Sequence, residues 1–509
     1  MLLTTLLLFA CATKDDDTGS AAGTSGTEVD ADTDTDSDTD SDTDTDTDTD
    51  TDTDTDTDTD TDTGTTDTDD TGTTETGDTG TAVCHDGELV ELWLSADDSN
   101  SMSSAVQARE RVNDGFSPGT IRPYEFLNYY TFDYPEADAG DVEVTVEMLQ
   151  GPSLPEGEYL LQIGVSSEAR TNSDRSPLNL AMSLDTSCSM NGEPMERAKD
   201  VCHSVASMLS AGDTVSMVTW AGSTAVLLDG HAVVSNNDPA VTDVCDDLAS
   251  GGGTDLHAGL VEAYDRVEAA YDPAKINRVM LVSDGGANMG VVSADLIDDK
   301  AGAADADGMY LVGVGVGSAA GYNDRLMDQV TDLGKGAAVF IPDAAEASKI
   351  FEERFVNTMD VAARNVEVQL TLPPGFELVE FSGEQVSTNR DEVDPQHLAP
   401  NDAMVFYQRI RSCAPGEVTD DSELSVQVHW QDESSFLPSV KQVDHTFGEL
   451  LGGSSPRLLR GRAIYAYAVA LDTQTSEDIA EADTYLTAAE AAYPGDAELA
   501  EIRGVLDAL

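Results

Sequence analysis

Five oxygen-bearing side chains in the middle of the chain have the types and spacing of ligands for a divalent metal ion. They are Asp185, Ser187, Ser189, Thr254 and Asp284. Residues at i, i+2 and i+4 of an extended segment face the same way, so the first acid and both serine hydroxyls can converge on one ion. Carboxylate and hydroxyl oxygens are hard ligands, and only two carboxylates leave space for waters and one open position on a six-coordinate cation. The set favours Mg²⁺, with Mn²⁺ or Ca²⁺ as alternatives.

The elements that would position these side chains begin at Pro177, where short apolar runs start to alternate with amphipathic segments. Strands are expected over 179–184 and 278–282, with helices between them. Regular alternation of strand and helix predicts an α/β fold with a doubly wound parallel sheet, which is Rossmann-like. Ligands of such sheets bind beyond the carboxyl ends of the strands. Asp185 and Asp284 follow predicted strands, so both are expected at that edge.

The metal-ligand pattern resembles a known protein family. Asp185-x-Ser187-x-Ser189, followed by Thr254 after a glycine run and by Asp284 in a Ser-Asp-Gly turn, resembles the metal-ion-dependent adhesion site (MIDAS) of von Willebrand factor type A (VWA) domains. In that family, the serines and the threonine bind the metal directly and the two aspartates act largely through water. An acidic side chain of a protein partner fills the open position. The resemblance implies the same roles here.

Other segments resemble the flanking regions of bacterial VWA lipoproteins. They are residues 95–101, 109, 113–115, 121–122, 125–130, 134–135, 321–327 and 363–370. This resemblance covers most of the chain after residue 90 and bears on architecture more than on function.

The flanks of the predicted sheet domain (177–357) have a different pattern. Parts of 82–176 and of 358–450 alternate between apolar and polar residues, which predicts half-buried strands. Neither flank has enough strands for a stable sandwich, so we expect one β-sandwich built from both sides of the chain. The region 451–509 has helical periodicity and is expected to form a C-terminal helical cap.

Cysteine positions suggest disulfides, although pairing cannot be read from a sequence. Cys84 and Cys413 lie in the two flanks, and a bridge between them would close the sandwich. Cys202 and Cys245 lie on predicted helices of the sheet domain and form the second expected pair.

The N-terminal residues predict export and anchoring. Residues 1–11 are apolar, too short to span a bilayer, and end in Leu-Phe-Ala-Cys, which resembles a bacterial lipobox with Cys11 as the lipidated residue. Ala12 resembles the pattern for sorting to the outer membrane of Gram-negative bacteria. Residues 12–81 are mostly Asp and Thr, which predicts a disordered tether. Whether this tether binds calcium or carries sugar stays open.

Composition excludes several classes of function. The chain has 99 acidic and 25 basic residues and a formal net charge of −74. A nucleic-acid-binding protein needs a basic face, which this composition does not provide. After the first ten residues no apolar run approaches the ~20 residues that span a bilayer, so any membrane attachment should run through the lipid anchor.

A hydrolase is one enzyme reading of the same residues. Ser187 or Ser189 could pair with His203 or His257, but the sequence has no G-x-S-x-G elbow around either serine. His203 falls on a predicted helix among packing residues. We therefore do not expect a hydrolase.

Nucleotide chemistry is the other enzyme reading. Gly315-x-Gly317-x-x-Ala320 fits a dinucleotide-binding pattern, but it does not follow the first strand and lacks the acidic residue that should come ~20 positions later. No P-loop is present. We expect a non-enzymatic protein of the cell envelope that binds an acidic protein ligand through its metal and has no small-molecule substrate. The alternatives are a structural surface protein whose metal only stabilises the fold, and a VWA subunit of an ATPase assembly.

Overall fold

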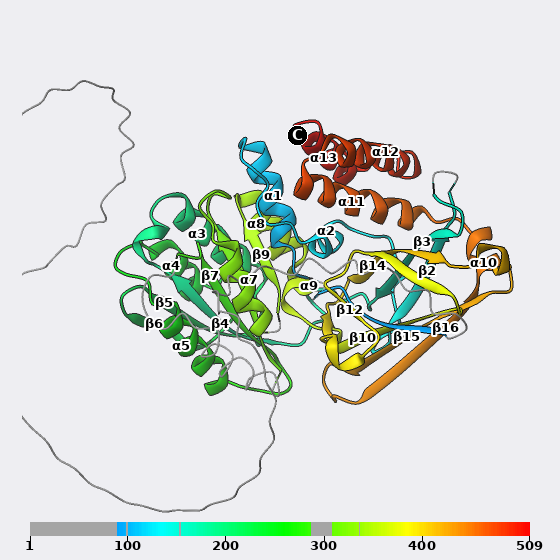
Figure 1. Ribbon diagram of the computed structural model, residues 1–509. Coiled ribbons are helices and arrows are strands. Elements are labelled where there is room, and N and C mark those ends of the chain that lie inside the picture. Colours follow the sequence, from blue (N-terminus) through cyan, green and yellow to red (C-terminus); the bar gives the residue numbers. More distant parts are fainter. Residues whose placement is uncertain (1–88, 98–99, 152–153, 287–307, 335) are drawn as a thin grey trace, which may run out of the picture. The chain divides into compact units, whose positions relative to one another are not determined.

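The computed structural model describes residues 89–97, 100–151, 154–286, 308–334 and 336–509 (Figure 1). The expected lipid anchor at Cys11, the tether over 12–81 and Cys84 lie outside the described residues. So does a further helix that the sequence predicts over 294–304.

A six-stranded sheet of order β6-β5-β4-β7-β8-β9 forms the central domain (Figure 1). Its strands are β4 (Leu178–Asp185), β5 (Thr214–Trp220), β6 (Thr224–Ala232), β7 (Ile276–Ser283), β8 (Met309–Val316) and β9 (Ala338–Ile341). Every residue of β4, β7 and β8 is buried, as expected for parallel strands covered on both faces. The predicted doubly wound sheet is confirmed, except that the edge strand β6 runs antiparallel to β5.

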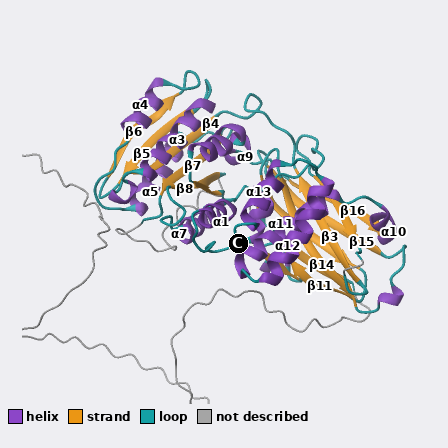
Figure 2. Cartoon of the chain, turned by 90° about the horizontal axis from the view of Figure 1, so that it is seen from above, coloured by secondary structure: helices purple, strands orange, loops and turns teal. Residues whose placement is uncertain are grey.

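Helices cover this sheet (Figure 2). They are α3 (Glu193–Met208), α4 (Pro239–Asp247), α5 (Leu256–Ala269), α7 (Asp324–Leu333), α8 (Ala344–Ser348) and α9 (Phe355–Met359). The residue pattern predicts a single helix over 344–356, but a π-turn, η2 (Lys349–Glu353), divides it. Phe351 within this turn and Phe355 and Met359 after it are all buried.

Two antiparallel sheets form the expected β-sandwich. One has the order β12-β1-β10-β15-β16, with β13 beside β10, and the other has the order β11-β14-β3-β2. The strands are β1 (Val90–Ser95), β2 (Glu143–Leu149), β3 (Glu158–Ser166), β10 (Ala363–Leu372), β11 (Phe376–Phe381), β12 (Gln385–Ser387), β13 (Gln396–Leu398), β14 (Ala403–Ser412), β15 (Glu423–Asp432) and β16 (Pro438–Thr446). Each sheet mixes strands from before and after the central domain, so the prediction of a sandwich built from both sides of the chain is confirmed.

The C-terminal region is helical, as predicted. It contains α10 (Phe447–Gly452), α11 (Pro456–Thr473), α12 (Ser476–Ala492) and α13 (Ala497–Leu506). Figure 2 shows α11 and α12 over the sheet that contains β3 and β14. Val405 and Tyr407 of β14 share a core with Leu458 and Ile464 of α11, so these helices bury the outer face of that sheet. Among the helices that the structure describes, none has the length and apolar content needed to cross a bilayer.

Two helices in the N-terminal flank were not predicted. They are α1 (Ser103–Asn113) and α2 (Pro123–Tyr129). The chain just before α1 closes the free edge of β9, because Met102 N donates to Ala338 O (2.7 Å) and Ala338 N donates to Ser101 Oγ (3.2 Å). This flank therefore belongs structurally to the central sheet as well as to the sandwich.

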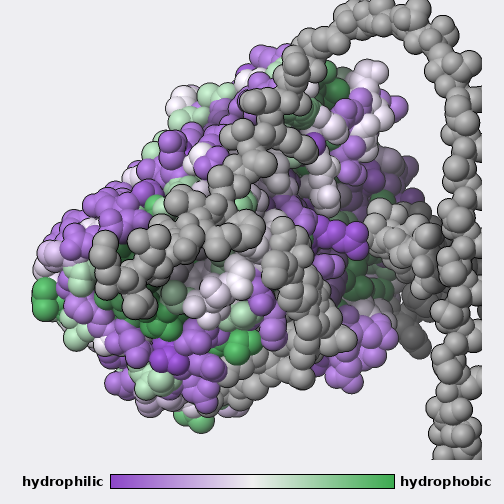
Figure 3. Space-filling view, turned by 90° about the vertical axis from the view of Figure 1, so that its left-hand side faces the viewer, coloured by the Kyte–Doolittle hydropathy of each residue, from purple (hydrophilic) through white to green (hydrophobic). Residues whose placement is uncertain are grey.

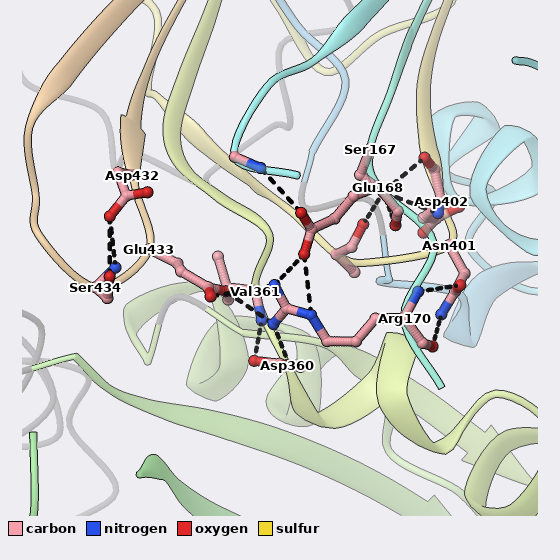
Figure 4. A network of polar contacts seen from close by, with 12 residues as sticks. Ser167, Glu168, Arg170, Asp360, Val361, Asn401, Asp402, Asp432, Glu433 and Ser434 are labelled. Atoms are coloured by element: carbon pink, nitrogen blue, oxygen red, sulfur yellow. Dashed lines mark hydrogen bonds and ion pairs between the residues drawn. The ribbon is translucent and has the colours of Figure 1, made fainter. Parts of the chain in front are cut away.

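The two connections between the sandwich and the central domain meet at one arginine. Figure 4 shows the Arg170 guanidinium between Glu168, Asp360 and Glu433. Its Nη1 lies 2.6 Å from Asp360 Oδ2 and 2.9 Å from Glu433 Oε2, and it also pairs with Glu168. Arg170 lies in the segment that leads into the central domain and Asp360 in the one that leaves it, so the guanidinium ties the two together.

The surface of the central domain is largely polar. Figure 3 shows the face at the left of Figure 1 as mostly hydrophilic, with small separate hydrophobic spots. Val226 and Leu227 of the edge strand β6 are 40% and 46% exposed. Scattered apolar residues of this kind are ordinary on a folded protein.

Candidate metal centre

The first loop of the candidate site begins at the end of β4. Asp185 is 1% exposed, and its carboxylate accepts hydrogen bonds from Ser187 N (2.8 Å to Oδ1) and from Ser283 Oγ (2.7 Å to Oδ2). Burial raises the pKa of Asp185 to about 6, against the opposing effect of these hydrogen bonds. The carboxylate is fixed in direction and lies in surroundings that disfavour its charge.

The two serine hydroxyls of this loop converge, though not by the predicted route. An extended segment was expected here, but residues 188–190 form a 3₁₀ turn in which Met190 N donates to Ser187 O (3.2 Å). The turn still brings Ser187 Oγ and Ser189 Oγ to 2.9 Å from each other. Convergence of the two hydroxyls therefore comes from the turn and not from the alternation of an extended segment.

The loop after β7, which is the third loop of the site along the chain, brings the second carboxylate to the same place. Asp284 follows β7, the neighbour of β4, and its Oδ1 accepts from Ser189 Oγ (3.2 Å) and from Gly286 N (2.9 Å). A continuous chain of polar contacts thus runs from Asp185 through Ser187 and Ser189 to Asp284. Both strands end at the carboxyl edge of the sheet, as the fold predicts.

Thr254 lies on a second loop that is bonded to the first. Gly251 N donates to Thr186 O (2.7 Å) and Cys188 N donates to Gly252 O (3.2 Å). Gly252 has φ +97°, a conformation that favours glycine. Thr254 itself is 1% exposed. The structure therefore links four predicted ligands by direct contacts and holds the fifth on a loop attached to them.

The residues present fit a divalent cation. Neutral hydroxyls and two carboxylates supply hard oxygen donors. The hydroxyls now hydrogen-bond to one another, and a bound cation would replace that contact. A Cβ added to Gly286 would lie 2.9 Å from both Asp284 Oδ1 and Ser189 Oγ, so the chain leaves this space free of side chains. Within the described residues no three His, Cys, Asp or Glu side chains form a metal-binding group, so an ion here depends on the hydroxyls.

One residue of the site was missed by sequence reasoning. Ser283 donates its hydroxyl proton to Asp185 and accepts from Gly285 N (3.0 Å), so it joins the first loop to the third. The Ser-Asp-Gly sequence was noted only for its aspartate. A serine at the end of a strand next to β4 was the available signal.

The other residues considered earlier lie elsewhere. Cys202 of α3 and Cys245 of α4 are joined by a disulfide. Cys413 is also disulfide-bonded, but Cys84 lies outside the described residues, so their pairing stays a prediction. His203 is half exposed and contacts Asp246 Oδ1 through Nε2 (3.0 Å), rather than either serine.

Comparison with known proteins decides the nature of the central domain. The family profile described as "von Willebrand factor type A domain" matches residues 179–353. These residues form a VWA domain. VWA domains commonly bind a divalent metal at the MIDAS, and they often mediate protein interactions.

The curated relatives of this chain are uncharacterised. It is 24% identical over 284 residues to the uncharacterised protein YfbK of Escherichia coli. This match covers 54% of this chain and 49% of the relative. It is 24% identical over 220 residues to the uncharacterised protein sll0103 of Synechocystis, which covers 43% of this chain and 51% of the relative. The chain thus spans about half the length of the curated relatives it matches.

Solved structures with similarity to this chain include VWA proteins. One is a von Willebrand factor type A protein from Catenulispora acidiphila, with 16% identity, a TM-score of 0.46, and coverage of 72% of this chain and 89% of that one. Another is proximal thread matrix protein 1 from the mussel byssus, with 16% identity, a TM-score of 0.30, and coverage of 36% and 48%. The latter protein is described with a zinc-occupied MIDAS motif.

Proposed function

We propose that this chain binds a protein partner through a divalent metal ion at the MIDAS of its VWA domain. The metal ligands would be Asp185, Ser187, Ser189, Thr254 and Asp284. The observation that carries the proposal is the chain of polar contacts between the loops after β4 and β7, at the edge where such sheets bind ligands. When bound, the ion supplies an open coordination position for an anionic oxygen. Mg²⁺ fits this oxygen-rich set, with Mn²⁺ or Ca²⁺ as alternatives.

The contacts of each side chain suggest its role. Asp185 is held back by Ser283 and by the Ser187 amide, so its carboxylate is placed to act through a bound water. Ser187 and Ser189 present their hydroxyls to each other and are free to turn lone pairs to an ion. With these roles, the side chains in direct contact with the ion are mostly neutral. The cation therefore stays electrophilic toward a carboxylate of the partner.

The partner we expect is a protein with an accessible Glu or Asp. A protein that carries a net charge of −74 repels such a partner at long range, and the metal must supply the local attraction. Neither a nucleic acid nor a small-molecule substrate is part of the proposal, and we propose no enzymatic activity. Capture of partner proteins with Mg²⁺ and with a chelator tests it, and capture should need the metal.

We further propose that the protein belongs to the cell envelope, lipid-anchored through Cys11, in the outer membrane of a Gram-negative bacterium. Replacement of Cys11 by Ser should then move the protein from the membrane fraction to the soluble fraction, because a serine cannot receive the thioether-linked lipid. Fractionation of expressing cells measures this. A Cys11→Ser protein that stays in the membrane fraction would show that another segment makes the attachment.

A further inference from the structure

The third loop of the metal site, which carries Asp284, is held by contacts with Asn323. Asn323 N donates to Asp284 O (3.2 Å), and Asn323 Nδ2 donates to Gly285 O (3.3 Å). Gly285 has φ +77°, and a Cβ there would lie 2.8 Å from Asn323 Cβ and 2.9 Å from Asn323 O. The loop that carries Asp284 is therefore packed and bonded against Asn323, so a shift of Asn323 must displace it.

The residue after Asn323 is held in turn by the N-terminal flank. Asp324, the first residue of α7, accepts from Ser103 Oγ (2.7 Å) on α1 and from Arg122 Nη1 (2.6 Å) and Nη2 (3.1 Å) beside α2. The side chains of Arg122 and Asp324 are only 9% and 7% exposed. A bidentate pair of this kind fixes direction as well as distance.

More contacts join the N-terminal flank to the segment that contains Asn323. The carbonyl oxygen of Ala319, four residues before Asn323, accepts from Arg111 Nη1 (3.2 Å) and Gln107 Nε2 (3.5 Å) of α1. Arg122 also pairs with the fully buried Glu125, whose other oxygen accepts from Ser104 N (2.6 Å). Both flank helices thus bear on the segment 319–324, which in turn bears on Asp284.

We infer that α1 and α2 regulate the metal site, and that Arg122 is a positioning residue for Asp284, acting through Asp324 and Asn323. This inference rests on the proposed metal binding. Docking of the flank and occupation of the site are then coupled, and the coupling is reciprocal: undocking weakens metal binding, and metal strengthens docking. A partner that pulls on the flank would change the affinity of the site.

The test uses metal alone as the probe, on the full chain. Asp324→Asn keeps the size of the side chain but loses the charge that holds Arg122, and Arg122→Met removes the clamp. Titration calorimetry with Mg²⁺ should show an affinity reduced by about tenfold in each, within the ~5–150-fold range of typical coupling. If Arg122→Met does not fold, Asp324→Asn decides the question.

Arg109→Met is the matched control. Arg109 also lies on α1 with a side chain 10% exposed, but it pairs with Glu346 on α8 (2.9 Å) and Glu501 on α13 (3.2 Å), away from the metal loops. Because these partners lie outside the segment 319–324, Arg109→Met should lower stability and reduce metal affinity much less than Asp324→Asn does. Hydrogen exchange of residues 103–129 gives the reciprocal measurement, and Mg²⁺ should slow it in the wild type but not in Asp324→Asn.

The outcomes separate this inference from the proposed function. If the wild-type chain binds no Mg²⁺ or Mn²⁺, the proposed function fails. If the wild type binds and a folded Asp324→Asn variant binds equally well, with Mg²⁺ leaving exchange in 103–129 unchanged, the inference is overturned while the proposed function stands. An equal loss of affinity in Arg109→Met would also overturn it, because any damage to the flank would then suffice.

Discussion

Replacement of Asp185 by Ala should weaken Mg²⁺ binding by roughly 100-fold, the upper end of the range for residues that act on a metal through a water. Asp185 is one of only two carboxylates in the site, and its bonds to Ser187 N and Ser283 Oγ hold the first and third loops together. The fold should survive, because the sheet core does not depend on this loop. Isothermal titration of the full chain with Mg²⁺ gives the affinity, and far-UV circular dichroism reports the fold.

An exposed carboxylate on the same domain serves as the control for this variant. Asp246 lies on α4, and its side chain is 71% exposed and contacts His203 Nε2 on α3 through Oδ1 (3.0 Å). Asp246→Ala removes the same charge from the domain and should leave the affinity unchanged. Equal affinity in Asp185→Ala and wild type would show that the metal binds elsewhere.

Replacement of Arg175 by Met should destabilise the protein by about 3–5 kcal/mol, the cost of leaving a buried charge without its partner. Arg175 lies just before β4, and it forms two hydrogen bonds to Asp213 (2.9 and 2.7 Å) with both side chains almost fully buried. Asp213 also accepts from Leu178 N, at the start of β4. Denaturant unfolding measures the loss. The surface pair of Arg390, whose side chain is 51% exposed, with Glu367 is the control, and Arg390→Met should cost less than ~1 kcal/mol.

The loss in Arg175→Met should depend on pH in a definite direction. Burial alone would raise the pKa of Asp213, but hydrogen bonds from Arg175 and backbone amides, with the charge of Arg175, lower that pKa below its usual value. The wild type therefore keeps this stabilisation above pH ~4 and loses it as pH falls through the lowered pKa. In the variant the buried carboxylate loses its cation and gains stability on protonation. The difference in unfolding free energy should narrow from pH 7 toward pH 4, and a constant difference would contradict the account.

Much of the fold could be predicted because its patterns are local. Strands β4, β7 and β8 are short and mostly apolar, and the strands of the sandwich alternate, as β10 and β15 show in their burial. Helix α1 could not be found in this way. Its buried residues include Ser103, Ser104, Gln107 and Arg109, whose polar character hides the helical period. They are buried because they bond to distant segments, which the local sequence does not show.

The site was predictable to the extent that its residues are grouped in short motifs. Asp185, Ser187 and Ser189 lie within five positions, and either an extended segment or a 3₁₀ turn would bring their oxygens together. The roles of Ser283, Asn323 and Arg122 depend on contacts between residues roughly forty to two hundred positions apart. Such contacts follow from strand order and helix docking, so they become visible only in the folded structure.

The most direct test of the central claim is the capture of partner proteins from envelope extracts on immobilised chain, with Mg²⁺ and with a chelator. The account predicts a partner that is retained with Mg²⁺, is released by chelator more than by salt, and is not captured by Asp185→Ala. Because both partners would be acidic near the contact, added salt should speed association until screening at a Debye length of ~8–10 Å removes the repulsion. Capture that is as strong with chelator, or by Asp185→Ala, as by the wild-type chain with Mg²⁺ would contradict metal-dependent binding. An association rate that falls steeply with salt would also contradict it and would indicate a basic partner held by the acidic surface.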